Sequence, residues 1–290
     1  VEVFRSNLYR EYHGRDYIPT TEDLLIDEQD LLRELRQVQP KIIVPLGRPA
    51  TRWFLGDVDM DSTWGIPWLI PVEQQEKLGF LGPATVVFPI HHPAAGFHNP
   101  EMSPYIVAGF GALSTFLEGE TEPRILFNDP YPEPQYEEIT TIGRLRSILR
   151  DNSRSTTLRK RHQVEPALNV SIDTEGSPAR PWSLQFSMQP GTAYLIRKTR
   201  PDLLAAFGDY LARLRPRVTY HSALHDLSMM RALQLPMDLP FDDTMVMAYL
   251  LQLEPQGLKP LCVRHCGMQM QSYDEVLGDA GQRLALDYFM

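Results

Sequence analysis

The sequence is poor in cysteine and has no long apolar run. Its 290 residues include only two cysteines, Cys262 and Cys266, four positions apart in an expected helix. Two thiols cannot build a disulfide framework, nor a zinc or iron–sulfur site ligated by cysteine alone. We therefore expect a reducing compartment. No stretch approaches the roughly 18 apolar residues that a membrane-spanning helix needs, so no membrane partner is expected.

The sequence also lacks an initiator methionine and a signal segment at Val1, and Met290 falls within a helical pattern. We expect a fragment that is open at both ends. The formal net charge of −9 argues against a surface that binds DNA nonspecifically as a polycation. Seven Arg or Lys residues nevertheless lie between Arg144 and Arg161, against the single acid Asp151. This stretch could contact phosphate or be an ordinary solvated surface, and both readings stay open.

The length exceeds the roughly 100 to 200 residues of a usual single domain. Residues 1–118 show an α/β pattern. It comprises a strand at 1–7, a helix at 21–38 with an N-cap at Thr20 or Thr21, a strand at 41–47 leading into a helix, a strand at 84–90 and a helix at 104–117. Prolines 123, 130, 132 and 134 mark a linker over residues 119–135.

Residues 136–290 show the pattern of a second α/β domain. The pattern predicts a helix at 142–149, strands at 168–175, 182–188 and 192–197, a helix at 201–214, and a strand at 218–221 followed by a helix. Three strands, a helix, a strand and a helix are how a ribonuclease-H-like fold begins. In the second strand, Trp182, Leu184, Phe186 and Met188 alternate with polar residues, so we expect these four to form one buried face.

The strand at 168–175 carries two acids on one face. Val170, Ile172 and Thr174 face one way by the two-residue strand period, so Asp173 and Glu175 lie side by side on the other. Adjacent carboxylates repel each other unless they are protonated or bridged by a cation, and hard oxygen ligands suit Mg²⁺ or Mn²⁺. Alone, such a pair is more often a solvent-facing strand with incidental acids.

A third acid, Asp226, falls in the first turn of the helix after the strand at 218–221. There it can face the end of the central strand. Together with Asp173 and Glu175 it could hold two ions that activate a water and stabilise the leaving oxygen in phosphodiester hydrolysis. The neighbouring His225 could contact DNA, although a histidine at a helix start is more often an ordinary surface residue.

Here the sequence resembles a known family. Residues 171–176 (SIDTEG) resemble the first exonuclease motif of family A DNA polymerases, and residues 220–226 (YHSALHD) resemble the second. Segments 241–251 and 257–262 continue the resemblance, which covers about residues 136–290. It implies a DEDD-type 3′-5′ exonuclease domain with two Mg²⁺ or Mn²⁺ ions. In that domain Asp173 would bridge the two ions, Glu175 would bind the ion on the side of the nucleophile, and Asp226 would hold the surroundings of the other ion.

Two features depart from that family. Ser222 stands where the family often carries Asn, and the third motif, Tyr-x-x-x-Asp, would lie beyond residue 290, so we expect a domain truncated at its C-terminus. The remaining acids of this region are expected to be structural or to lie on the surface: Asp242 and Asp243 structural, Asp279 and Asp287 on the surface.

Residues 1–118 are similar to the uracil-DNA glycosylase superfamily, especially its family 4 type. The resemblance rests on Asn7 after a strand, the segment 40–47 (PKIIVPLG) and the segment 92–95 (HPAA). It implies that Asn7 hydrogen-bonds a flipped uracil and that His92 stabilises the departing base. The family's upstream Gly-rich motif, with its water-activating acid, would precede Val1, and its iron–sulfur cysteines have no counterparts here. A structural or exposed role for His91 and His92 therefore stays open.

Together, the two resemblances imply a fragment of a bacteriophage-type family A DNA polymerase. A glycosylase-like domain (1–118), a linker (119–135) and an exonuclease domain (136–290) would precede a polymerase domain in the same full-length chain. The implied function is proofreading during DNA replication, by two-metal hydrolysis at single-stranded 3′ ends of DNA, in the cytoplasm of a bacterial host. The alternatives are a non-catalytic module that binds and positions DNA, and a scaffold with accidental acids.

Overall fold

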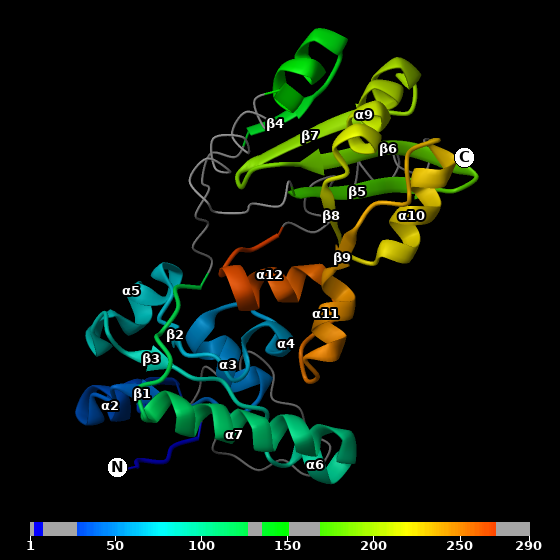
Figure 1. The fold of residues 1–290 in the computed structure, drawn as a ribbon. Helices are drawn as coiled ribbons and strands as arrows, with labels where there is room; N and C mark the ends of the chain where they lie inside the picture. Colours follow the sequence, from blue (N-terminus) through cyan, green and yellow to red (C-terminus); the bar gives the residue numbers. More distant parts are fainter. Residues whose placement is uncertain (1–2, 8–27, 127–134, 151–168, 271–290) are drawn as a thin grey trace. The chain divides into compact units, whose positions relative to one another are not determined.

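The computed structural model describes residues 3–7, 28–126, 135–150 and 169–270, and the chain divides into two compact units (Figure 1). Unit 1 comprises Val1–Asp129 and Lys259–Met290, and unit 2 comprises Pro130–Leu258. None of the described helices is both long and apolar enough to cross a membrane.

Unit 1 is an α/β body around a small sheet of order β1-β3-β2, in which β1 is parallel and β2 antiparallel to β3. Its elements are α2 (Glu28–Val38), β1 (Ile42–Ile43), α3 (Arg48–Leu55), α4 (Met60–Thr63), β2 (Trp68–Leu69), η1 (Val72–Gln74), α5 (Gln75–Leu78), η2 (Gly79–Leu81), β3 (Val86–Val87), α6 (Ala95–His98), η3 (Pro100–Met102), α7 (Ser103–Leu117) and α12 (Leu258–Cys266).

Most elements expected in this unit form, but the strands are short. The predicted strands at 41–47 and 84–90 reduce to β1 and β3, with one further bridge between Leu46 and Ile90. The predicted strand at 1–7 is wrong, because residues 3–7 are irregular and no described strand pairs with them. The start of the helix predicted at 21–38, with its N-cap, lies outside the described residues.

Burial of apolar side chains explains why this unit holds together. On α2, Leu31, Leu32 and Leu35 share one face and are buried. They join a cluster that includes Trp68 of β2, which is fully buried. Removing such surface from water is the main stabilising contribution to a small core.

The helix α12 contributes to unit 1, although its sequence follows unit 2. Val263 is part of the unit 1 core cluster. Arg264, only 5% exposed, donates from Nη1 to the backbone oxygens of Trp64 at 2.9 Å and Asp61 at 3.2 Å. The contact-defined boundary thus differs from the expected domain 136–290, since Lys259 and the residues after it group with unit 1.

Unit 2 is built on a six-stranded sheet of order β4-β7-β6-β5-β8-β9. Its elements are β4 (Gln135–Glu138), a helix covering residues 142–150, β5 (Asn169–Ser177), β6 (Arg180–Ser187), β7 (Thr192–Arg197), α9 (Pro201–Leu214), β8 (Arg217–Tyr220), α10 (Ala223–Ala232), β9 (Phe241–Asp243) and α11 (Thr244–Leu250). The central strand β5 is antiparallel to β6 and parallel to β8. This is the α/β, ribonuclease-H-like order that the sequence predicts.

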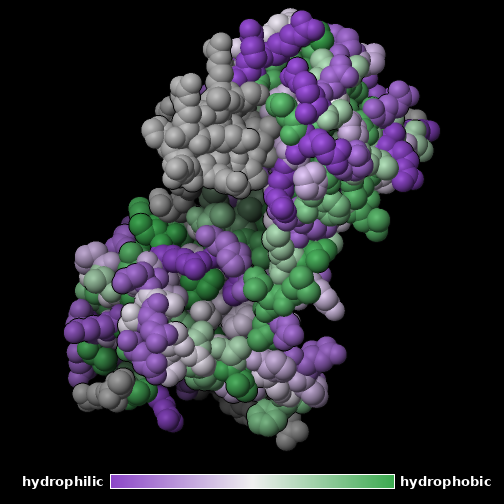
Figure 2. Space-filling model, in the orientation of Figure 1, coloured by the Kyte–Doolittle hydropathy of each residue, from purple (hydrophilic) through white to green (hydrophobic). Residues whose placement is uncertain are grey.

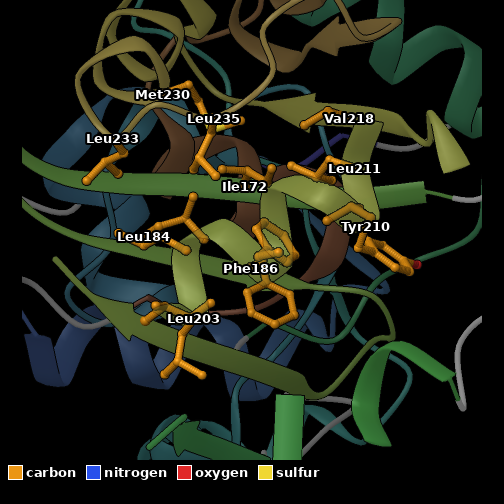
Figure 3. Close-up of a cluster of buried hydrophobic side chains, with 14 of the residues drawn as sticks. Ile172, Leu184, Phe186, Leu203, Tyr210, Leu211, Val218, Met230, Leu233 and Leu235 are labelled. Atoms are coloured by element: carbon orange, nitrogen blue, oxygen red, sulfur yellow. The ribbon is translucent and has the colours of Figure 1, made fainter. Parts of the chain in front are cut away.

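One face of this sheet carries the unit 2 core. Ile172, Leu184 and Phe186 project toward α9, where they meet Leu203 and Leu211 (Figure 3). The two-residue period of β5 and β6 and the helical spacing on α9 bring these side chains to one layer. The opposite face of β5 is left free of that core.

Three details of unit 2 differ from the expectations. Trp182 is 41% exposed at the start of β6, so the predicted buried alternation holds fully for Leu184 and Phe186 and in part for Met188, which packs half-buried against the core. Strand β4 begins inside the predicted linker, where it pairs with β7. Strand β9 was not predicted, because three residues are too few to show a period. In the view of Figure 2, hydrophilic residues cover much of the visible face of this unit.

Candidate active site

The two acids of β5 lie on the exposed face of the central strand. Val170, Ile172 and Thr174 are buried, whereas Asp173 and Glu175 are exposed, as the strand period predicts. Because β5 lies between β6 and β8, neighbouring strands fix its direction on both sides. The structure therefore places both carboxylates side by side on one rigid surface.

A bulge next to Glu175 makes glycine necessary at the following position. The β5–β6 register shifts between Glu175 and Gly176, and Gly176 has a φ of +111°. A Cβ at Gly176 would lie 2.5 Å from the backbone oxygen of Arg180 and 3.0 Å from the nitrogen of Trp182. The last residue of the segment 171–176 thus has a backbone role in directing Glu175.

The electrostatics of this pair favour a cation. Partial desolvation raises the pKa of Asp173, against the opposing effects of the Thr174 backbone and of His225 and His221. Desolvation also raises the pKa of Glu175, and the charge of Asp173 raises it further. Two partly desolvated carboxylates, one of which raises the pKa of the other, are groups whose ionised forms a bound positive ion would stabilise.

The third predicted acid, Asp226, lies on α10 but faces inward. It is 2% exposed, and its Oδ1 accepts a hydrogen bond of 2.7 Å from Thr174 Oγ1. Burial raises its pKa to about 6, and the charge of Asp173 adds to the rise. Asp226 therefore lies close enough to Asp173 for their charges to interact, but it approaches β5 from the side of Thr174.

The junction between β8 and α10 is held by Asp243. Its Oδ2 accepts from Ala223 N at 2.7 Å, and its Oδ1 accepts from Ser222 N at 3.1 Å and from Met245 N at 2.9 Å. Burial alone would raise the pKa of Asp243, but its backbone N–H donors, including that of Val246, hold it below the ordinary value. This carboxylate caps the starts of two helices, which is the structural role expected for it.

Its neighbour Asp242 has a different task. Asp242 Oδ1 accepts from Arg217 Nη1 at 2.8 Å in an ion pair near the surface. Asp242 and Asp243 therefore both act structurally. The surface positions expected for Asp279 and Asp287 lie outside the described residues.

Two histidines lie beside the carboxylates. His225 is exposed at the start of α10, and its charge acts on Asp173, Glu175 and Asp226 alike. His221 is partly buried, and its Nδ1 lies 2.9 Å from Thr244 Oγ1. The site thus combines three acids with two groups that can carry positive charge.

The fit to a divalent ion is partial. Within residues 3–7, 28–126, 135–150 and 169–270, no group of three or more His, Cys, Asp or Glu side chains is arranged to hold a metal ion. Asp173 and Glu175 nevertheless suit one Mg²⁺, which commonly takes one or two carboxylates and completes its shell with water and substrate phosphate. Asp226, tied to Thr174, does not join them in this arrangement. The predicted pair of ions therefore stays a prediction.

Two polar residues on β6 were not predicted as part of the site. Gln185 lies directly opposite Asp173, and Ser183 lies directly opposite Glu175. Gln185 Nε2 donates to Ser183 Oγ at 2.9 Å. Their alternation with buried Leu184 shows in the sequence, but only the pairing register shows which acid each of them faces.

In unit 1, the structure separates the roles of the two adjacent histidines. His92 is exposed, and its Nδ1 accepts from Ala94 N at 3.1 Å within its own loop. His91 is buried against the rings of Trp64 and Tyr105, and burial lowers its pKa. The buried member of the pair is thus His91, whereas the resemblance assigns the base-binding role to the exposed His92.

The other predicted base-binding residue, Asn7, lies exposed in the irregular segment 3–7. The preceding Ser6 donates to Glu34 on α2. No hydrogen bond between Asn7 and His92 is found in the part of the chain that the structure describes. Their predicted cooperation on a flipped base stays a prediction.

The basic stretch from Arg144 is described only as far as residue 150. There, Arg144 is engaged in a bidentate ion pair with Glu137 of β4, with bonds of 2.6 to 3.0 Å. A guanidinium bound in this way is not free to bind phosphate. Arg144 therefore fits the second alternative, an ordinary solvated surface. Arg146 and Arg150 are exposed on the same helix, and the basic residues from Arg154 to Arg161 lie outside the described residues.

No protein-family model matches the chain. Among curated proteins, it is similar to a type-4 uracil-DNA glycosylase from Saccharolobus solfataricus, with 24% identity over 130 residues, 41% of this chain and 54% of that protein. The chain thus spans about half the length of this curated relative.

Solved structures resemble about half of the chain. The catalytic core of RRP6 from Trypanosoma brucei matches with a TM-score of 0.40 and 11% identity, covering 54% of this chain and 41% of that one. NrnC from Brucella melitensis with bound Mg²⁺ matches with a TM-score of 0.33 and 22% identity, covering 53% of this chain and 72% of that one. Escherichia coli RNase D, an exoribonuclease involved in structured RNA processing, matches with a TM-score of 0.35 and 17% identity. The match covers 52% of this chain and 40% of that one.

Proposed function

We propose that unit 2 is a metal-dependent 3′-5′ exonuclease, an enzyme that hydrolyses the terminal phosphodiester of a nucleic acid strand. The observation that supports this most is the placement of Asp173 and Glu175. They lie side by side on the exposed face of the central strand of a ribonuclease-H-like sheet, with Asp226 in electrostatic reach. Partly buried carboxylates with raised pKa values that gather at one place are typical of functional sites.

Each side chain has a distinct task in this proposal. Asp173 and Glu175 would hold a divalent ion, which supplies an activated water and stabilises charge on the scissile phosphate when bound. Thr174 holds Asp226 against β5 through its hydroxyl. Asp243 fixes the start of α10, and with it the position of Asp226.

The finer proposal follows from the motifs in residues 171–176 and 220–226. Their resemblance to family A DNA polymerases supports a proofreading exonuclease of a bacteriophage-type polymerase, acting on single-stranded 3′ ends of DNA with two Mg²⁺ or Mn²⁺ ions. The polymerase domain would belong to the same full-length chain, in a bacterial cytoplasm. Residues 1–118 would form its glycosylase-like domain, in which Asn7 would hydrogen-bond a flipped uracil and His92 would stabilise the departing base.

A second candidate function is a non-catalytic module that binds and positions DNA. It is favoured by the lack of a three-ligand metal group among the described residues and by the inward position of Asp226. In this reading the acids of β5 remain without a metal, and the unit contributes binding surface only.

Digestion of 5′-labelled single-stranded DNA separates the two candidates. With Mg²⁺ or Mn²⁺, an exonuclease acting from the 3′ end yields a ladder of shortening labelled products. Asp173→Asn should lower the rate by roughly 100-fold or more, because it removes the negative charge with which Asp173 would bind the ion. Asp209→Asn is the matched control, since Asp209 is an exposed acid on α9. DNA that is bound but stays intact would overturn the exonuclease and support the positioning module.

A further inference from the structure

The polar residues of β6 form a row opposite the acids of β5. The antiparallel register pairs Asp173 with Gln185 and Glu175 with Ser183. Directly opposed side chains in such a pair share one face, with Cβ atoms about 4.5 to 5.5 Å apart. Each carboxylate of the candidate site therefore has one polar neighbour across the strand pair.

Gln185 in this row has an unsatisfied buried atom. Its Nε2 donates to Ser183 Oγ at 2.9 Å, and Ser183 is itself 1% exposed. Its Oε1 is buried without a hydrogen-bond partner, the one such side-chain atom among the described residues of unit 2. A buried polar atom without a hydrogen-bond partner is unfavourable, because it has lost its bonds to water, so its presence calls for a reason.

Rotation of the amide supplies that reason. The oxygen and nitrogen of a glutamine amide have nearly the same shape, and hydrogen bonding decides their assignment. After a half-turn, Oε1 accepts from the Ser183 hydroxyl, and the two N–H groups of Gln185 take the place of the unsatisfied oxygen. That place lies on the face that Gln185 shares with Asp173, which as a carboxylate accepts hydrogen bonds but cannot donate them.

We propose that Gln185 is a positioning residue of the candidate site. Anchored by Ser183, its amide donates a hydrogen bond to Asp173 and fixes the carboxylate so that its remaining lone pairs face a divalent ion. This inference rests on the proposed function, because it assumes an ion at Asp173 and Glu175.

The chemistry of an amide suits this task. Mg²⁺ requires near-octahedral geometry, so a freely rotating carboxylate is a poor ligand. A neutral donor orients the carboxylate without competing with the cation. A lysine or arginine, which is positively charged, would compete with it. Outer partners of this kind commonly change metal affinity or activity by about 10- to 100-fold when they are removed.

The test measures Mn²⁺ binding to the full 290-residue chain by isothermal titration calorimetry, so it does not depend on activity. Gln185→Met keeps the length of the side chain and removes the amide. Its affinity should be about 10- to 100-fold weaker than that of the wild type. Gln189→Met is the matched control at an exposed position near the end of β6, and it should bind as the wild type does. Asp173→Asn identifies the part of the binding that belongs to the site.

A second variant covers the case in which Gln185→Met fails to fold. Ser183→Ala removes the anchor but leaves the amide, and it should weaken Mn²⁺ binding in the same direction by a smaller factor. In DNA digestion, both variants should lower kcat and leave KM for the strand unchanged, because the substrate contacts remain. A purely structural role would lower the melting temperature without a change in Mn²⁺ affinity per folded molecule.

The outcomes also separate this inference from the proposed function. If the wild type binds Mn²⁺ through Asp173 and both variants bind it equally well, Gln185 is not a positioning residue, whether or not DNA is cut. If binding is weakened as expected but no DNA is cut, the inference stands and the exonuclease fails. If no Mn²⁺ binding depends on Asp173, both are overturned.

Discussion

The hydroxyl of Thr174 donates a 2.7 Å hydrogen bond to Asp226 and thereby joins the central strand β5 to helix α10. Both residues are buried, at 4% and 2% exposure. Thr174 is also the residue between Asp173 and Glu175, on the opposite face of the strand. A single strand thus presents two acids to solvent and anchors the third from its core side.

Replacement of Thr174 tests this link. Thr174→Val keeps the shape and removes the donor, which leaves a buried carboxyl without its hydrogen bond. The variant should lose about 1 to 3 kcal/mol of unfolding free energy in urea denaturation. Thr174→Ser is the control, since it retains the hydroxyl and should lose less. Equal stability of the valine variant and the wild type would show that the bond contributes nothing.

Asp226 should make the stability depend on pH. Its pKa is about 6 in the fold, against about 3.9 in an unfolded chain. The folded state therefore binds more protons between these values, and stability present below pH 4 is lost as the pH rises through about 6. The total loss is about 2 to 3 kcal/mol, at about 1.4 kcal/mol per unit of pKa difference.

Asp226→Asn removes this dependence, because an amide stays neutral and still accepts from Thr174. In EDTA, calorimetry should find the variant about 2 to 3 kcal/mol more stable than the wild type at pH 8 and equal to it near pH 4. A difference that does not change with pH would mean that Asp226 titrates normally.

How much of this site could be predicted depends on the range of the interactions involved. The exposed pair Asp173 and Glu175 follows from the local period of β5, which five alternating residues make plain. The inward position of Asp226 could not be predicted, because it depends on a bond across 52 positions in the sequence. The pairing of Gln185 with Asp173 likewise needs the strand register, which no local pattern gives.

The fold shows the same division. Helix α9 forms where the apolar spacing and the proline at its start predict it. The edge strands β4 and β9 could not be predicted, because three or four residues are too few to show the two-residue alternation of a strand. Helix α12 could be recognised as a helix, but its place in unit 1 depends on Arg264 binding backbone oxygens 200 or more positions away.

Asp242 and Asp243 offer a comparison of neighbouring acids. Asp243→Asn removes charged acceptors from the backbone donors at the starts of α10 and α11, and it should cost about 2 kcal/mol. Asp242→Asn breaks only an ion pair with Arg217 near the surface, which is worth about 0 to 1 kcal/mol. Urea denaturation of the two variants should preserve this order. A larger loss for Asp242 would contradict the capping role.

Ser222 is a position where the chain is strained. It adopts a left-handed conformation, with φ of 74° and ψ of 58°, which costs most L-residues roughly 1 to 2 kcal/mol and is better tolerated by Gly and Asn. Ser222→Gly and Ser222→Asn should therefore raise the unfolding free energy by about 0.5 to 1 kcal/mol. Ser228→Gly, inside α10, is the control and should lower it by a similar amount. Loss of stability in both Ser222 variants would show that its hydroxyl outweighs the strain.

Arg264 should determine the stability of unit 1, although it follows unit 2 in sequence. Its guanidinium lies over the ring of Trp64 and binds two backbone oxygens at the end of α4. Arg264→Leu would leave those oxygens without this donor and remove the cation–π contact, so we expect a loss of about 2 to 4 kcal/mol.

Tryptophan fluorescence can assign that loss to one unit. Three of the four tryptophans, Trp53, Trp64 and Trp68, lie in unit 1. In a Trp182→Phe background the emission therefore reports on unit 1 alone during urea denaturation. Arg213→Leu, at an exposed position of α9, should leave this transition within about 0.5 kcal/mol of the background. If Arg264→Leu also leaves it unchanged, α12 is not a stabilising part of unit 1, and the domain boundary expected from the sequence would be preferred.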